Sequence, residues 1–152
     1  MNGPLISAKG VSRRYGRIVA LAPTSLEVHP RDALALIGPN GAGKSTLLSI
    51  LAGALDPSDG AVTVAAPRIG WVPQKPAHYQ RLSPRENLEL FARLEAVPEP
   101  RDVANRYIGL LDLPDDGRLT AELSAGNQQR LNLAVALLSG PDVLLLDEPT
   151  AS

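Results

Sequence analysis

Residues 38–45 read GPNGAGKS and match the pattern G-x-x-x-x-G-K-[ST]. Before it, Ala33–Ile37 is apolar at every position, which predicts a strand buried on both faces. After it, Thr46–Leu55 is leucine-rich and long enough for a helix. A strand, a glycine-rich loop and a helix in this order are the context that a phosphate-binding loop requires.

The chemistry of this loop explains its residue types. Glycines allow backbone N–H groups to turn toward phosphate oxygens, and the helix adds its positive N-terminal end. Lys44 supplies a cation, and the Ser45 hydroxyl is able to reach a magnesium ion. A chance glycine loop is the alternative. We therefore expect nucleotide phosphates to contact Gly38, Pro39, Asn40, Gly41, Ala42, Gly43, Lys44, Ser45 and Thr46.

A second apolar run ends in two carboxylates. Val143–Leu146 predicts a buried strand, and Asp147 and Glu148 follow it directly. We expect Asp147 to hold magnesium, directly or through water, and Glu148 to polarise the water that attacks the terminal phosphoryl group. The alternative is a strand that leaves the core through a solvated acidic turn.

The rest of the chain divides into a strand-rich part and a helical part. Short apolar runs between turns predict further strands at residues 5–8, 25–28, 61–65 and 68–72. Ser83-Pro84-Arg85-Glu86 has the pattern of a helix N-cap with a capping box, and later patterns predict helices over Val103–Leu111 and Asn127–Leu138. We predict one domain over residues 1–152, in which a core of residues 1–75 and 123–152 contains a helical insert at about 76–122.

Composition limits the class of protein. The 152 residues are 44% hydrophobic and 20% charged, which is typical of a globular domain. A net charge of -1 gives no broad basic field, so no nucleic-acid partner is expected. The chain has no cysteine and no apolar run of the ~18 residues that a membrane span needs, and we expect a cytoplasmic location.

The order of these motifs resembles the ATPase domain of ABC transporters. GPNGAGKS is followed by Gln74 within WVPQ, then by LSAGNQQR at residues 123–130 and by VLLLDEPT at 143–150. The resemblance covers essentially the whole chain. It implies an α/β fold with a P-loop NTPase core, a mostly parallel sheet with flanking helices, an N-terminal antiparallel β part and an inserted α-helical subdomain. It also implies that ATP and Mg2+ are bound.

The same resemblance assigns roles to residues outside the phosphate loop. Ser124 and Gly126 belong to the signature loop, which binds the terminal phosphate of an ATP held by a second ATPase domain, in a homodimer or a heterodimer. Their alternative is an ordinary helix N-cap. Gln74 is implied to reach magnesium or the attacking water, although it also reads as an exposed loop glutamine. Tyr15 is implied to stack on adenine, although a lone tyrosine after a strand is as often a packing residue.

The partner implied by the resemblance is a transmembrane permease subunit on which the inserted helices dock, so that the chain lies peripherally on the cytoplasmic face of the membrane. Residues 81–88 look like the contact region of exporter subunits, which slightly favours export. Ala125 and Asn127 depart from the usual signature residues. Two alternatives remain: a soluble ABC-type ATPase of translation or DNA repair, and an ATP-binding fragment without turnover.

The resemblance implies that the family's sequence continues past the position of Ser152. The switch histidine that contacts the terminal phosphate is expected there, together with a strand that lies between residues 33–37 and 143–146. We therefore expect a C-terminally truncated domain with a marginal fold, because strands without neighbours leave backbone groups unpaired. The sequence therefore does not decide whether this chain alone hydrolyses ATP.

Overall fold

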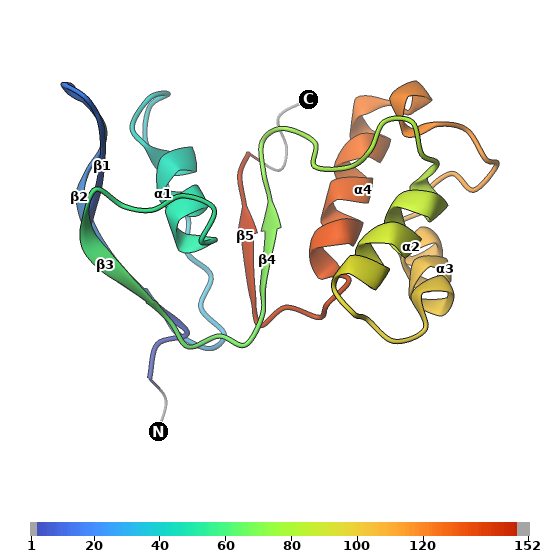
Figure 1. Ribbon diagram of the computed structural model, residues 1–152, viewed down its shortest axis with the longest axis horizontal. Coiled ribbons are helices and arrows are strands. Elements are labelled where there is room, and N and C mark those ends of the chain that lie inside the picture. Colours follow the sequence, from blue (N-terminus) through green and yellow to red (C-terminus); the bar gives the residue numbers. More distant parts are fainter. Residues whose placement is uncertain (1–2, 149–152) are drawn as a thin grey trace. The chain divides into compact units, whose positions relative to one another are not determined.

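The computed structural model describes residues 3–148. Its internal contacts divide the chain into two compact units, one up to Ile69 and one from Gly70 onward, and each is described by itself. The element order is shown in Figure 1.

The first unit is built on a three-stranded antiparallel sheet in the order β2-β1-β3. Its strands are β1 (Ile6–Tyr15), β2 (Ile18–Val28) and β3 (Asp59–Val64). A tight turn at Gly16 and Arg17 joins β1 to β2, and it pairs Tyr15 with Ile18. The N-terminal antiparallel part expected from the sequence is confirmed, and its strands are longer than the short apolar runs that predicted them.

Helix α1 (Lys44–Leu51) follows the glycine loop, as predicted, and buries Leu47, Leu48, Ile50 and Leu51. It is shorter than the expected span of residues 46–55. The helix ends because Gly53 takes a left-handed conformation with φ +72° and its N–H donates to the Ile50 carbonyl oxygen.

The predicted strand at residues 33–37 is wrong. These residues belong to no strand of the described chain and are exposed, and the Ile37 side chain is 93% accessible. An apolar run becomes a strand only when neighbouring strands accept and donate its backbone hydrogen bonds. Within residues 3–69 the three paired strands are β1, β2 and β3, and none of them pairs with this run.

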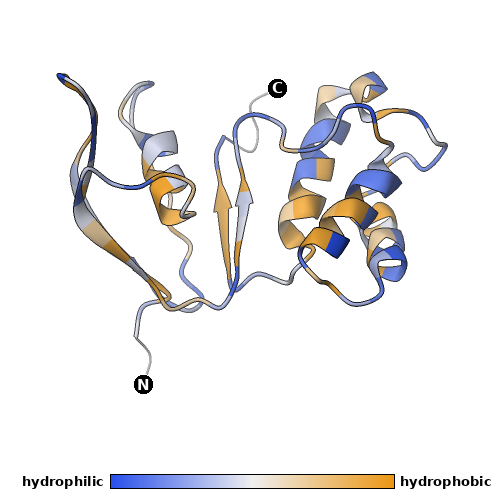
Figure 2. Cartoon of the chain, in the orientation of Figure 1, coloured by the Kyte–Doolittle hydropathy of each residue, from blue (hydrophilic) through white to orange (hydrophobic). Residues whose placement is uncertain are grey.

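The second unit contains a two-stranded sheet and a group of helices. Strands β4 (Ile69–Val72) and β5 (Val143–Leu146) pair, and the Asp147 N–H after β5 donates to the carbonyl oxygen of Val72 at the end of β4. The two strands therefore end at the same edge and run parallel, as Figure 1 shows. Figure 2 shows that β5 is hydrophobic along its length. Both strands match their predictions from the sequence.

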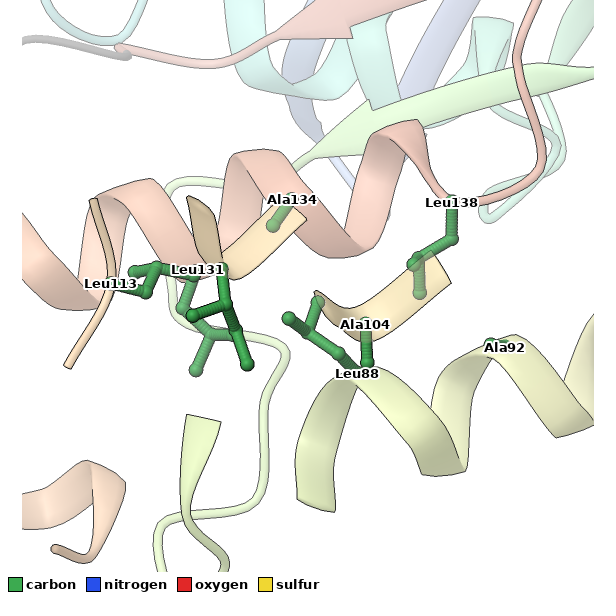
Figure 3. Packing of buried hydrophobic residues seen from close by; sticks show 8 residues of the cluster. Leu88, Ala92, Ala104, Leu113, Leu131, Ala134 and Leu138 are labelled. Carbon is green, nitrogen blue, oxygen red and sulfur yellow. The ribbon is translucent and has the colours of Figure 1, made fainter. Parts of the chain in front are cut away.

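Three helices form the core of this unit: α2 (Pro84–Leu94), α3 (Pro100–Leu110) and α4 (Ala125–Leu137), with a short 3-10 turn η1 (Thr120–Glu122) before α4. The predicted capping box at Ser83 and Glu86 is present, with both reciprocal hydrogen bonds. Figure 3 shows the apolar side chains from all three helices gathered together. The buried cluster consists of Leu88, Ala92, Ala104, Ile108, Leu113, Leu131, Ala134 and Leu138.

Candidate functional site

At Gly43, the last glycine of the loop, the backbone has a conformation and surroundings that only glycine accepts. Gly41 has φ +83° and Gly43 has φ +90°, both in the left-handed region. A Cβ atom at Gly43 would lie 2.6 Å from the Ala20 carbonyl oxygen on β2. Gly43 is the N-cap residue of α1, so the loop brings the start of this helix against the sheet.

Lys44 closes over this loop. Its Nζ atom donates to the carbonyl oxygen of Gly38 at 2.8 Å and to that of Pro39 at 3.0 Å. An ammonium group carries three donors, so a further one is left for a phosphate oxygen. Residues 38–42 are exposed, whereas Gly43, Lys44, Ser45 and Thr46 are half-buried at the start of α1. The structure thus gathers the predicted phosphate contacts, Gly38 to Thr46, around one helix N-terminus.

Tyr15 is the last residue of β1, in the same unit as the glycine loop, and its side chain is 51% accessible. The guanidinium carbon of Arg13 lies 4.6 Å from the centre of its ring. The ring therefore already has a cation over one face. Its role in stacking on adenine stays a prediction.

The acidic turn after β5 places Asp147 and Glu148 differently. Asp147 is 5% accessible, and its N–H bonds to Val72. Glu148 is exposed and has φ +48°, an uncommon conformation for a residue with a side chain that costs about 1 kcal/mol or more. Pro149 and Thr150, which complete the sequence motif, lie outside the described residues.

Gln74 forms a hydrogen bond with this turn. Its Nε2 atom donates to Glu148 Oε2 at 2.9 Å, although the two residues are 74 positions apart in the sequence. Because the amide nitrogen is used in this bond, the Oε1 oxygen of Gln74 is the atom left to face a cation. The structure thus brings Gln74, Asp147 and Glu148 together at the edge where β4 and β5 end.

The expected signature loop forms the N-terminus of α4. The Ser124 hydroxyl caps this helix by accepting from the Asn127 N–H at 3.3 Å, and Ser124 and Gly126 are exposed. Gln128 secures the entry to the helix, because its Nε2 atom donates to the Thr120 and Leu123 carbonyl oxygens. Binding of a partner's ATP by Ser124 and Gly126 stays a prediction.

No cluster of three or more histidine, aspartate or glutamate side chains within residues 3–148 is arranged to hold a metal ion. Magnesium prefers oxygen ligands and usually binds through one or two carboxylates, water and substrate phosphates. Ser45 in the first unit and Gln74 and Asp147 in the second carry oxygen donors of this kind. Binding of Mg2+ by Ser45, Gln74 and Asp147 stays a prediction.

Sequence reasoning missed three buried polar residues that bind or belong to the segment that follows Gln74. His78, Asn87 and Asn132 are each less than 10% accessible and are linked to the segment that follows Gln74. Burial lowers the pKa of His78 below its usual 6.5, although its hydrogen bond to Asn132 acts in the opposite direction. An asparagine within an apolar helical stretch, as in Leu131-Asn132-Leu133, was the available signal.

The family model and the similar proteins agree on one family. The family model described as "ABC transporter" matches residues 21–151. The chain is 37% identical to the probable multidrug ABC transporter ATP-binding protein YbhF of Escherichia coli K12, over 98% of this chain and 28% of that protein. It is 40% identical to the zinc import ATP-binding protein ZnuC of Roseobacter denitrificans, over 96% of this chain and 57% of that protein. The chain thus spans less than two thirds of either relative.

A solved structure has the same fold. The dimeric structure of a post-hydrolysis state of the ATP-binding cassette MJ0796, bound to ADP and Pi, aligns with a TM-score of 0.83 at 26% identity. The alignment covers 95% of this chain and 74% of that one. The α/β fold of a P-loop ATPase cassette, expected from the sequence, is confirmed by this likeness.

Proposed function

The chain belongs to the ABC transporter family, and from that membership we propose that it is an ATP-binding subunit that hydrolyses ATP to power the movement of a substrate across a membrane. The observation that carries the proposal is the glycine loop at the start of α1. Its left-handed glycines, the helix N-terminus and Lys44 form one anion-binding surface.

In this proposal different residues of the chain bind the phosphates, hold Mg2+ and accept a proton. Backbone N–H groups of the loop and the Lys44 ammonium hold the phosphates. Ser45, Gln74 and Asp147 would hold Mg2+, which when bound neutralises charge that develops on the phosphoryl oxygens. Glu148 accepts a proton from the attacking water, and the hydrogen bond from Gln74 fixes one of its carboxylate oxygens, leaving the other for that water.

We further propose that Ser124 and Gly126 bind the terminal phosphate of an ATP held by a second copy or a related domain. The exposed N-terminus of α4 supports this, because its N–H groups and the Ser124 hydroxyl are suitable donors for a phosphate. The dimeric cassette to which the chain is similar also supports an assembly of two domains. Residues 1–75 and 123–152 form the nucleotide-binding core in this proposal, and residues 76–122 the helical insert.

The proposed membrane partner is a permease that docks on residues 76–90, which would place the chain on the cytoplasmic face. Among residues 3–148 no helix is long and apolar enough to cross a membrane. We favour export because of the exporter-like segment 81–88, although relatives named for multidrug transport and for zinc import match at similar identity. Co-purification with candidate permeases of each class, with and without substitutions in residues 76–90, tests both points.

Calorimetric titration with Mg-ATP tests nucleotide binding. We expect saturable binding that is lost in Lys44→Ala and retained in Lys9→Ala, which removes an exposed lysine from β1. Circular dichroism establishes that all three proteins are folded. If the folded wild-type chain does not bind Mg-ATP, or if Lys9→Ala loses binding as fully as Lys44→Ala, the loop is not the nucleotide site of this chain.

A further inference from the structure

A buried asparagine on α4 holds the segment that follows Gln74. The Oδ1 atom of Asn132 lies 3.3 Å from the backbone nitrogen of Ala77, which donates to it, and 2.9 Å from Nδ1 of His78. Asn132 is 4% accessible and His78 is 7% accessible. One side-chain oxygen in the middle of α4 therefore binds two consecutive residues of this segment.

These contacts also fix the state of the histidine. The Ala77 N–H requires an acceptor, so Asn132 presents its oxygen and not its nitrogen. Because that oxygen also faces Nδ1 of His78, the proton of the neutral imidazole lies on Nδ1. Burial disfavours the charged form, so His78 donates this bond as a neutral ring.

A second asparagine holds the next residue from α2. Asn87, which is fully buried, accepts from the Tyr79 N–H at 2.7 Å and donates to the Tyr79 carbonyl oxygen at 2.9 Å. Residues 77–79 are thus bound to α4 through Asn132 and to α2 through Asn87. Helix α4 begins at the expected signature loop. The contacts of Asn132 therefore connect the helix of that loop to the segment that follows Gln74.

The connection from Ala77 back to Gln74 is short and stiff. Only Lys75 and Pro76 lie between these residues, and Pro76 fixes its own φ and restricts Lys75. Pro73 fixes φ on the other side of Gln74. At the other end, Val72 is held by the Asp147 N–H. A shift at Ala77 therefore has few backbone torsions in which to dissipate before it reaches Gln74.

We propose that Asn132 is a positioning residue that sets the orientation of Gln74 relative to α4. Its Oδ1 atom accepts one hydrogen bond from Ala77 and a second from His78. Loss of the Oδ1 acceptor frees Ala77 and weakens the bond between Gln74 and Glu148. The structural link is independent of ATP, whereas its consequence for hydrolysis rests on the proposed function.

Solution NMR without nucleotide tests the link. Asn132→Leu removes the acceptor and keeps the branched shape and the number of heavy atoms, although leucine is larger. Asn132→Asp retains the acceptor, and Leu131→Ala disturbs the same helix at a residue for which no bond to Ala77 is described. We expect Asn132→Leu to accelerate amide hydrogen exchange at Ala77 about tenfold, the effect of losing one buried hydrogen bond, and to shift the side-chain NH2 resonances of Gln74. Asn132→Asp should restore both signals, and Leu131→Ala should lower the melting temperature without moving Gln74.

The proposal fails if Asn132→Leu accelerates exchange at Ala77 while the Gln74 resonances stay unchanged, or if Leu131→Ala shifts them equally. Should Asn132→Leu not fold, His78→Leu removes only the second donor and should give a smaller shift of the same resonances; no shift would overturn the proposal. Mg-ATP is added afterwards. Failure to bind it would count against the proposed function and leave the NMR result intact, whereas normal binding with reduced kcat in Asn132→Leu would extend the link to hydrolysis.

Discussion

Gln74 and Glu148 are joined by a hydrogen bond of 2.9 Å between Nε2 and Oε2. One residue follows β4 and the other follows β5, and the parallel pairing of these strands brings their ends to the same edge. The bond orients a carboxylate that is otherwise exposed and whose backbone is in the left-handed region. The hydrogen bond from Gln74 therefore occupies Oε2 and leaves Oε1 as the carboxylate oxygen without this partner.

Glu148→Gln should abolish turnover while preserving nucleotide binding. The amide cannot accept a proton from water, and loss of a general base lowers kcat by about 10²- to 10⁴-fold. Phosphate release and calorimetry measure kcat and the Kd for Mg-ATP separately. Glu95→Gln, at an exposed position after α2, is the matched control and should leave both unchanged. A Glu148→Gln protein with wild-type turnover would remove Glu148 from the mechanism.

Gly43→Ala should destabilise the first unit more than Gly53→Ala does. Both glycines have positive φ, so both variants carry backbone strain of about 1 kcal/mol. Only at Gly43 would the added Cβ meet the Ala20 carbonyl oxygen, at 2.6 Å, which forces the loop away from β2. Denaturant unfolding gives the two free energies, and equal losses would contradict the close packing described for the loop.

Ser83→Ala should lower the free energy of unfolding by about 1 kcal/mol, because it removes the N-cap of α2. The Ser83 hydroxyl accepts from the Glu86 N–H, and the Glu86 carboxylate accepts from the Ser83 N–H at 2.8 Å. Ser83→Thr keeps the hydroxyl and should retain most of the stability. Urea denaturation compares the three proteins, and an equal effect of alanine and threonine would show that the cap contributes little.

His78 should make the protein less stable as the pH falls. Its pKa in the folded chain lies below 6.5, so the unfolded chain takes up the proton first. The free energy of unfolding therefore falls as the pH drops through about 6.5, by at most about 1.4 kcal/mol per pH unit, until the folded pKa is reached. Above this window His78 contributes no pH dependence.

Urea unfolding at several pH values between about 7 and 5 measures this slope, above the range in which most carboxylates titrate. His78→Gln should flatten it. A slope that survives in His78→Gln would assign the pH dependence to another group.

Local patterns predicted most of the fold because the relevant physics is local. The glycine loop, the capping box at Ser83 and the apolar run at 143–146 all formed as expected. The run at 33–37 did not, although it is as apolar as 143–146. Hydrophobicity is encoded in single residues, whereas a strand needs a hydrogen-bonded neighbour that another part of the chain must supply.

Residue type and spacing alone were sufficient to predict the family and the glycine loop before α1, because both are recorded in short stretches of the sequence. The hydrogen bond between Gln74 and Glu148, and those that join Asn132 to Ala77 and His78, became known only from the folded chain. These partners lie more than 50 residues apart in the chain. Contacts at such separation depend on how β4, β5 and α4 pack, and no local pattern records that packing.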